Sequence, residues 1–292
     1  MAFVCVDVGG TNTLIGVGNG EFEIKDRLKT KEFLSDPQER IRDIIRSSSH
    51  SDSEVEKLAV AVAGPMDREK GVFYPPNIQE MDEVQIVEPM EALGDVTILN
   101  DCTSAVAGEY FYGEKKCDNM VYLTISSGIG TGAVVDGEIV EGWNGNAGEV
   151  GHIIVGTEGV TCGCGGTDHW EAYCSGEGMP EMAREVFGED YESSIEIFRA
   201  SEDGESSAEK VIEKMQECNS AGFANVVNVF NPEVIWIGGA VALNHFSTVV
   251  EETLEEAGRQ TANEMPEFRK CSLEDEAVIH GLRAACNGMF EV

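Results

Sequence analysis

The segment FVCVDVGGTNTLIGVGNGEFEI (residues 3–24) decides the fold. It reads as an apolar strand, a glycine-rich turn, a second strand, an Asn-Gly hairpin turn and a third strand. Glycines in the first turn let backbone N–H groups approach an anion closely, and Thr11 and Asn12 add donors. Taken alone, the segment predicts an ordinary β-hairpin, whose first turn has the donors to hold an anion.

A second segment, MVYLTISSGIGTGAVVDGEIV (residues 120–140), repeats this plan. A shift of 117 residues aligns the two segments without gaps, with Phe3 on Met120 and Gly20 on Gly137. Matching strands and turns at one offset indicate two related halves, each offering its turn to a cleft between them. Two such turns favour a nucleotide, with Asp7 orienting hydrated Mg²⁺ beside its β and γ phosphates.

Strands and helices alternate around these hairpins. Asp36 and Pro37 mark the start of a helix, because they are typical N-cap and first-turn residues. Further elements are predicted as buried strands at 57–64, 96–100 and 234–239 and a long helix at 208–230, whereas the acidic segment 189–209 is expected to lie outside the core. We place a hinge near Tyr110, which gives an N-terminal small domain (1–110) and a C-terminal large domain (111–292).

Composition limits the possible partners and the setting. The chain has 292 residues, 42% of them hydrophobic, which suffices for two domains. Its 54 acidic and 20 basic residues give a formal charge of −34, which disfavours nucleic acid and is typical of a protein from a halophilic archaeon. Nine cysteines without a leader or a membrane-spanning run indicate a reduced, cytoplasmic protein, so paired thiols are first interpreted as metal ligands.

Six motifs resemble those of the ROK family of sugar kinases in the actin-like ATPase superfamily, in the family's order and at about its spacing. They are DVGGT (7–11), AGP (63–65), PPN (75–77), NDCTSAVAGE (100–109), GEVGH (148–152) and CGCGGTDHWE (162–171). The resemblance covers nearly the whole chain. It implies a two-lobed α/β fold of the actin-like (ribonuclease H-like) type, with duplicated sheet-based domains, a cleft between them and a last helix that packs back on the small lobe.

The resemblance implies an ATP-dependent hexokinase that phosphorylates the 6-hydroxyl of glucose, an early reaction of glycolysis. Asp101 follows the buried strand at the end where α/β folds place ligands, and the family's matching aspartate is the general base; Asp101 could also cap the next helix. The implied sugar-binding residues are Asn77, Asn100, Asp101, Glu149, His152 and Glu171. Nucleotide contacts are expected from Asp7, Gly9, Gly10, Thr11, Asn12, Ser127, Gly128, Gly130, Thr131, Gly132, Gly238 and Gly239.

The resemblance further implies a structural Zn²⁺ in the segment CGCGGTDHWE. The family's CxCGxxGCxE pattern is altered twice, with Asp168 for a glycine and His169 for the third cysteine. A Cys₂His₂ set still suits tetrahedral Zn²⁺, and Cys174 is a substitute ligand if His169 points away. The zinc would fix one nitrogen of His152, so that its other N–H reaches a sugar hydroxyl. The expected metal ligands are therefore His152, Cys162, Cys164 and His169.

Several alternatives remain open from the sequence. The acceptor could be fructose, mannose, allose or an N-acylmannosamine, and the donor could be another nucleotide or polyphosphate. A ROK-type transcriptional regulator would need an N-terminal helix-turn-helix, but the phosphate turn begins at residue 7 and the net charge repels DNA. A sugar sensor without catalysis is disfavoured by Asp7, Asp101 and both glycine turns. A homodimer is expected by resemblance alone.

Overall fold

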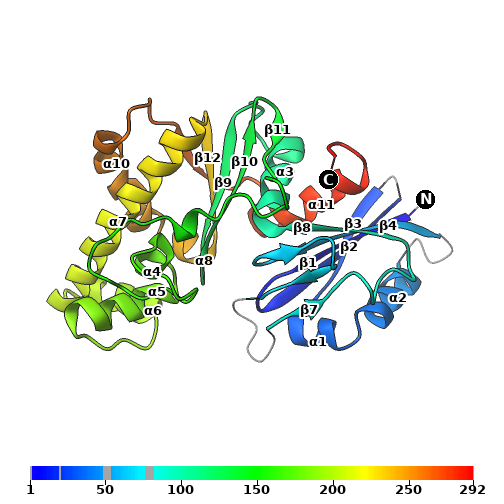
Figure 1. Cartoon of the computed structure of the whole chain (residues 1–292), viewed down its shortest axis with the longest axis horizontal. Coiled ribbons are helices and arrows are strands. Elements are labelled where there is room, and N and C mark those ends of the chain that lie inside the picture. The colour runs from blue at the N-terminus through cyan, green and yellow to red at the C-terminus, as the bar shows by residue number, and fades with distance from the viewer. Residues whose placement is uncertain (1, 20, 49–53, 76–81, 292) are drawn as a thin grey trace. The chain divides into compact units, whose positions relative to one another are not determined.

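A computed structural model describes residues 2–19, 21–48, 54–75 and 82–291. The chain divides into two compact units, both of mixed helix and strand (Figure 1). The first unit comprises Met1–Lys116, Glu138–Ala147 and Ser272–Val292, and the second comprises Cys117–Gly137 and Gly148–Cys271. Two segments beyond Lys116 therefore fold with the N-terminal part of the chain.

The first unit is built on a sheet of five strands. They are β1 (Ala2–Val8), β2 (Asn12–Asn19), β3 (Glu21–Lys29), β4 (Val55–Val62) and β8 (Asp95–Asn100), in the order β3-β2-β1-β4-β8. The first three strands form an antiparallel meander, and β1, β4 and β8 run parallel. The C-terminal ends of β1, β4 and β8 therefore meet at one edge, where ligands bind in folds of this kind.

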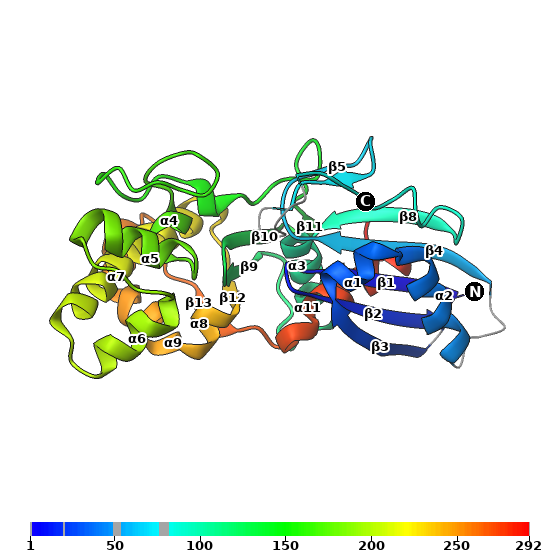
Figure 2. The same ribbon diagram turned by 90° about the horizontal axis from the view of Figure 1, so that it is seen from below.

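Alternate side chains of β1 pack into two hydrophobic clusters on opposite faces of the sheet, because successive residues of a strand face opposite sides. Val4 and Val6 join a cluster with Phe33 and Ile41 from helices α1 (Thr30–Ser35) and α2 (Pro37–Ser47). On the other face, Cys5 packs near Ile279 of α11 (Ala277–Cys286), which in turn packs on α3 (Asp101–Tyr112). Figures 1 and 2 show these two helical layers on either side of the sheet.

The predicted start of α2 is confirmed. Asp36 accepts a hydrogen bond from the backbone N–H of Glu39 at 3.2 Å, and Pro37 is the first helical residue. Such a cap satisfies a donor that the helix itself leaves unpaired.

A small antiparallel sheet completes the first unit. It consists of β5 (Met66–Asp67), β6 (Val72–Phe73) and β7 (Val84–Gln85). The side chain of Asn146 accepts from the backbone N–H of Met66 at 2.9 Å and donates to its carbonyl at 2.9 Å. These two bonds attach the segment Glu138–Ala147, which contains β11 (Glu138–Ile139), to the first unit.

The second unit repeats the strand plan. Strands β10 (Ile129–Val135), β9 (Met120–Ile125), β12 (Val234–Gly238) and β13 (Glu267–Lys270) lie in the order β10-β9-β12-β13, again an antiparallel hairpin followed by parallel strands. The predicted internal repeat thus appears in both sheets.

The two hairpins differ in length by one residue. Val8 pairs with Thr13, which leaves the four residues 9–12 in the first turn. Ile125 pairs with Ile129, which leaves the three residues 126–128 in the second. The gap-free alignment of the two segments is therefore wrong by one residue in the second strand of each hairpin.

Helix α7 (Ser206–Phe230) forms the centre of the second unit. Its predicted apolar stripe is confirmed, because Val211, Met215, Cys218 and Val226 are all buried. The expectation that segment 189–209 lies outside the core is wrong in part, since α6 (Ser194–Glu202) packs on α7 through the buried Ile197 and Phe198. The apolar pair is short, and the acidic residues around it hide its pattern in the sequence.

The remaining helices are short. They are η1 (Val150–His152), α4 (Trp170–Cys174), α5 (Gly178–Met182), η2 (Ala183–Phe187), α8 (Ala240–Asn244), α9 (Phe246–Val249), η3 (Glu251–Thr253), α10 (Leu254–Gln260) and, in the first unit, η4 (Glu274–Glu276). Among the described residues, no helix is both long and apolar enough to cross a membrane.

Candidate active site and metal centre

The first phosphate turn is closed by a backbone hydrogen bond from Gly9 N to Asn12 O at 3.1 Å. The hydroxyl of Thr30, the first residue of α1, donates to the carbonyl of Gly9 at 2.6 Å and supports the turn. Lys29 Nζ donates to Asn12 Oδ1 at 3.0 Å, which brings a positive charge to the turn. The sequence analysis missed Lys29, because its place depends on the β2–β3 register that pairs it with Asn12.

Asp101 lies at the C-terminal end of β8, as predicted, but the helix cap is its neighbour. Asn100 has extended backbone angles, and its Oδ1 accepts from Cys102 N at 2.9 Å and Thr103 N at 3.1 Å. Asp101 is the first residue of α3, and its carboxylate accepts from Cys102 N at 2.8 Å. The expected N-cap role of Asp101 is thus corrected, because only a residue with non-helical angles just before the first turn can cap it.

The negative charge of Asp101 acts on Asp7 in the first unit. Asp7 lies in β1 and Asp101 directly follows β8, and these two strands flank β4 in the sheet. Burial and, second to it, the negative charge of Asp101 raise the pKa of Asp7 to about 7. Burial also raises the pKa of Asp101. The hydrogen bond from the backbone N–H of Cys102 lowers this pKa and offsets part of the increase. A carboxylate with a raised pKa is a better proton acceptor, which is what a general base requires. Asn77, also expected near the sugar, lies outside the described residues.

The motif GEVGH passes close to β10 in the second unit. Gly148 has a φ of 96°, and a Cβ there would lie 1.9 Å from Thr131 O. At Gly151 a Cβ would lie 2.3 Å from Ile129 O. Both glycines are therefore required by backbone contact. Glu149 lies between them in the chain, and His152 directly follows the second. His152 Nε2 lies 3.6 Å from Glu149 Oε2.

Four predicted metal ligands come together in the second unit. One donor atom from each of His152, Cys162, Cys164 and His169 lies within 4.8 Å of the others. His152 Nδ1 is 3.9 Å from Cys162 Sγ, and His169 Nδ1 is 3.3 Å from Cys164 Sγ. Usual Zn–S and Zn–N bond lengths in a tetrahedron separate S and N by about 3.6 Å. The residues present therefore fit a tetrahedral metal ion with His152 bound through Nδ1.

The substitute ligand Cys174 is not part of this cluster. It is buried and its thiol donates to Met215 O at 3.3 Å, so the structure favours His169. Glu171 points towards the second phosphate turn, where its Oε2 accepts from Ile129 N at 2.8 Å. A Cβ on Gly128 would lie 2.5 Å from the same oxygen, so a larger residue there would displace the Glu171 carboxylate. The segment that carries Cys162, Cys164 and His169, called the metal turn below, is thus joined to the second phosphate turn through Glu171.

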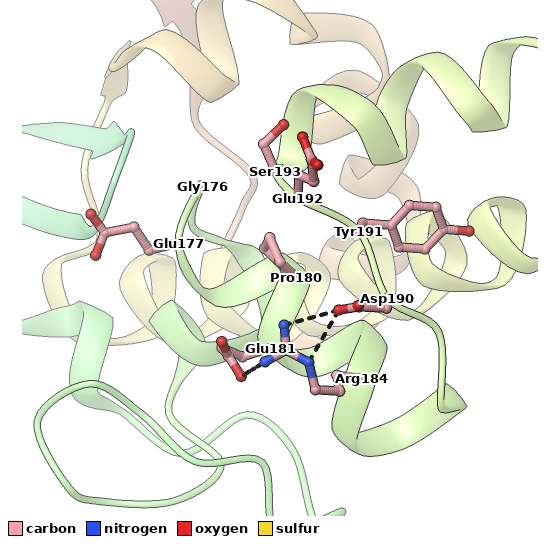
Figure 3. A pocket seen from close by; sticks show the side chains of 9 residues that line it. All are labelled: Gly176, Glu177, Pro180, Glu181, Arg184, Asp190, Tyr191, Glu192 and Ser193. Carbon is pink, nitrogen blue, oxygen red and sulfur yellow. Dashed lines mark hydrogen bonds and ion pairs between the residues drawn. The ribbon is translucent and has the colours of Figure 1, made fainter.

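The second phosphate turn borders a pocket of ≈ 600 Å³ that the sequence did not predict (Figure 3). Gly176 N donates to Ser126 O at 2.7 Å and Glu177 N to Ser127 O at 3.3 Å, so the pocket rim is tied to the turn. Arg184 crosses the pocket wall and binds Glu181 at 2.6 Å and Asp190 at 3.1 Å. The pocket is lined by Gly176, Glu177, Pro180, Glu181, Arg184, Asp190, Tyr191, Glu192 and Ser193.

Gly239, one of the predicted nucleotide-binding glycines, lies near this pocket. Gly239 has a φ of 87°, and a Cβ there would lie 2.4 Å from Ile125 O, at the end of β9. Val241, two residues on, would contact a Cβ of Gly176 at 3.3 Å. Thr131, another predicted nucleotide contact, lies inside β10 and is only 1% exposed. Its hydroxyl has no partner among the described residues. Gly130 and Gly132 flank it in the same strand.

Comparison with known proteins gives the family. The sequence model described as "ROK family" matches residues 3–287. A glucokinase from Pyrobaculum calidifontis is 31% identical over 284 residues, which are 97% of this chain and 94% of the relative. A glucokinase from Aeropyrum pernix is 33% identical over 264 residues, 83% of this chain and 82% of the relative. An N-acetylmannosamine kinase from Escherichia coli is 28% identical over 87% of this chain and 88% of its own length.

The fold matches as well. The crystal structure of a ROK hexokinase from Thermus thermophilus superposes with a TM-score of 0.82 at 29% identity, and covers 97% of this chain and 96% of its own. The chain belongs to the ROK family and has its actin-like α/β fold.

Proposed function

We propose that this chain is a glucokinase that transfers the γ-phosphate of ATP to the 6-hydroxyl of glucose. The observation that carries the proposal is the identity to two glucokinases over most of the chain, together with Asp101 at the end of β8. The test is ADP release from Mg-ATP over a panel of sugars. Turnover with glucose well above that with fructose, mannose or N-acetylmannosamine is expected, and absence of turnover with every hexose would contradict the proposal.

Asp101 is proposed as the general base. Its carboxylate would accept the proton of the 6-hydroxyl as that oxygen attacks the γ-phosphorus, and the proton stays on Asp101 until it passes to solvent after transfer. The raised pKa of Asp101 supports this role, because the carboxylate holds a proton more tightly than an exposed aspartate does. Asn100 uses its amide oxygen to cap α3, which leaves the amide nitrogen to donate to a sugar oxygen.

Asp7 and the two glycine turns are proposed to hold the phosphates. Mg²⁺ near Asp7 would neutralise the charge on the β and γ phosphates. The backbone N–H groups of residues 9–12 and 127–128 would donate to phosphate oxygens, and Lys29 would add a cation at the first turn. For the base of ATP, the pocket beside Gly176 and the nearby Gly239 turn support a place in the second unit.

Glu149, His152 and Glu171 are proposed to contact sugar hydroxyls, as are Asn77, Asn100 and Asp101. Zn²⁺ bound by the four ligands would act as a structural cross-link of the turn. With Nδ1 of His152 directed at the ligand cluster, its Nε2 side faces Glu149 at 3.6 Å. A hydroxyl placed between these groups would accept from the histidine and donate to the carboxylate. Such a paired contact discriminates between epimers, because a misplaced hydroxyl on a bound sugar would cover these polar groups and leave them unsatisfied.

A second candidate is N-acetylmannosamine kinase, favoured by the relative of that name at 28% identity. Because this identity is lower than that to the two glucokinases, we rank N-acetylmannosamine behind glucose as the substrate. Comparing kcat/KM for glucose and N-acetylmannosamine decides between them.

The setting of the protein is also part of the proposal. Since ATP is the donor, we place the reaction in the cytoplasm. The charge of −34 supports a halophilic setting, in which screening by salt removes most of the self-repulsion. A homodimer is proposed from the family, and light scattering coupled to size exclusion tests it.

A further inference from the structure

Asp168 joins two stretches of the metal turn at a backbone position that favours glycine. Its φ is 60°, in the left-handed region, which aspartate enters more readily than most residues do. Its backbone N–H donates to Val160 O at 2.8 Å, and its carbonyl accepts from Val155 N at 3.0 Å. The main chain of Asp168 therefore connects the start and the end of the turn that carries the ligands.

The carboxylate of Asp168 strengthens the same connection. A single oxygen, Oδ1, accepts from Gly159 N at 2.7 Å, from Val160 N at 3.1 Å and from the hydroxyl of Tyr173 at 2.5 Å. Tyr173 belongs to α4 and is fully buried. A glycine at position 168 would keep the backbone conformation and lose all three bonds.

The connection continues into the body of the second unit. The hydroxyl of Tyr173 also lies 2.9 Å from Glu158 Oε2. Glu158 in turn pairs with Lys214 of α7 at 2.6 Å, and the Lys214 side chain is only 12% exposed. The metal turn is thereby anchored to the long central helix through polar contacts that need no metal.

The ligands lie close to these anchor points along the chain. Cys162 follows Val160 by two residues, and its N–H donates to Gly166 O at 2.9 Å. Thr161 and Thr167 form an antiparallel bridge, and His169 directly follows Asp168. Fixing Gly159 and Val160 on Asp168 therefore fixes the separation of Cys162 and His169.

We propose that Asp168 is a positioning residue of the metal centre, which holds the turn in its ligating arrangement before the metal binds. The inference rests on the metal site put forward under the proposed function. It also connects the two departures from the family motif: a neutral histidine replaces an anionic thiolate ligand, and the adjacent aspartate supplies preorganisation that a glycine cannot. Groups that orient metal ligands commonly contribute about 10- to 100-fold in metal affinity.

The test is Zn²⁺ affinity of the full chain, measured by competition with a chromophoric chelator in KCl without sugar or nucleotide. Asp168→Gly is expected to bind zinc about 10- to 100-fold more weakly and to release it faster to excess chelator. Asp168→Asn keeps an acceptor oxygen and tolerates the left-handed conformation, so it should restore most of the affinity. The matched control is Asp136→Gly, because Asp136 is also left-handed, with a φ of 52°, but lies in a hairpin turn; its zinc affinity should equal that of the wild type.

Tyr173→Phe gives a second reading if Asp168→Gly does not fold. It removes only the hydroxyl that donates to Asp168 and is expected to weaken zinc binding by a smaller factor. Its control is Tyr191→Phe, which loses a similar hydroxyl bond to Glu205 outside the metal turn. Wild-type zinc affinity in folded Asp168→Gly would overturn the role of Asp168 but not the metal site. If Asp168→Gly does not fold, wild-type zinc affinity in Tyr173→Phe would have the same meaning. A wild-type protein that binds no zinc would overturn both, whether or not it phosphorylates glucose.

Discussion

Glu109 accepts hydrogen bonds from the hydroxyl of Ser272 at 2.6 Å and, through its other oxygen, from the backbone N–H of Leu273 at 3.0 Å. Glu109 is fully buried in α3, and Ser272 is the residue at which the chain re-enters the first unit after Cys271. The carboxylate thus fastens the segment that leads to α11.

Replacing Glu109 by alanine should destabilise the protein by about 1–3 kcal/mol, because the Ser272 hydroxyl and the Leu273 N–H lose their acceptor. Urea unfolding at fixed salt measures this loss. Glu114→Ala is the matched control: Glu114 is exposed, and only its backbone N–H binds Ser272, so it should stay within about 0.5 kcal/mol of the wild type. Equal stability of the two variants would contradict the role of Glu109.

Asp101→Asn should lower kcat by about 10²- to 10⁴-fold and leave glucose binding nearly unchanged, because the amide keeps the shape of the side chain but accepts no proton at neutral pH. Steady-state kinetics and calorimetric glucose titration measure the two effects. Asp95→Asn, at the exposed start of β8, the strand that precedes Asp101, serves as the control and should keep the wild-type kcat. Turnover of Asp101→Asn close to wild type would exclude Asp101 as the base.

Asp7 should make the metal-free protein less stable as the pH rises. Its folded pKa of about 7 lies above its ordinary value near 4, so the folded state binds a proton that the unfolded chain has already released. This contribution to stability is present at and below about pH 4 and is lost as the pH rises through about 7. Urea unfolding of wild type and Asp7→Asn at several pH values checks it. The stability of the variant relative to wild type should increase across this range, and a constant difference would show that the pKa of Asp7 is not raised.

High salt should be needed for activity. With a formal charge of −34, like charges repel one another across the surface at low ionic strength, and molar KCl shortens the range of this repulsion to about 3 Å. Kinase activity and far-UV circular dichroism should both increase from low to molar KCl. Full activity and unchanged secondary structure in dilute buffer would indicate an acidic protein without halophilic adaptation.

Local patterns predicted much of the fold. The strands near the two glycine turns follow from short apolar runs, and α2 follows from Asp36 and Pro37, whose preferences act over a few residues. The metal ligands could be named for a similar reason, since CxC in a glycine-rich segment keeps two donors together wherever the turn lies. Assigning His152 as a further ligand required the family resemblance.

Features that depend on register or on distant packing were missed. Lys29 reaches the first turn only because β3 pairs with β2 so that it lies opposite Asn12. The choice of Asn100 over Asp101 as the helix cap depends on a single residue's backbone angles, which composition does not fix. The pocket beside Gly176 is lined by residues of the single stretch 176–193, in which no sequence pattern indicates a cavity.

The difference of one residue between the two hairpin turns separates the duplicated halves chemically. A four-residue turn and a three-residue turn cannot direct the same set of amide hydrogens at a ligand, even though the strands around them follow one plan. A linear triphosphate has two unlike ends, one bonded to a nucleoside and one to be transferred. Two turns of unequal length offer two different sets of amide donors, as a ligand with unlike ends requires.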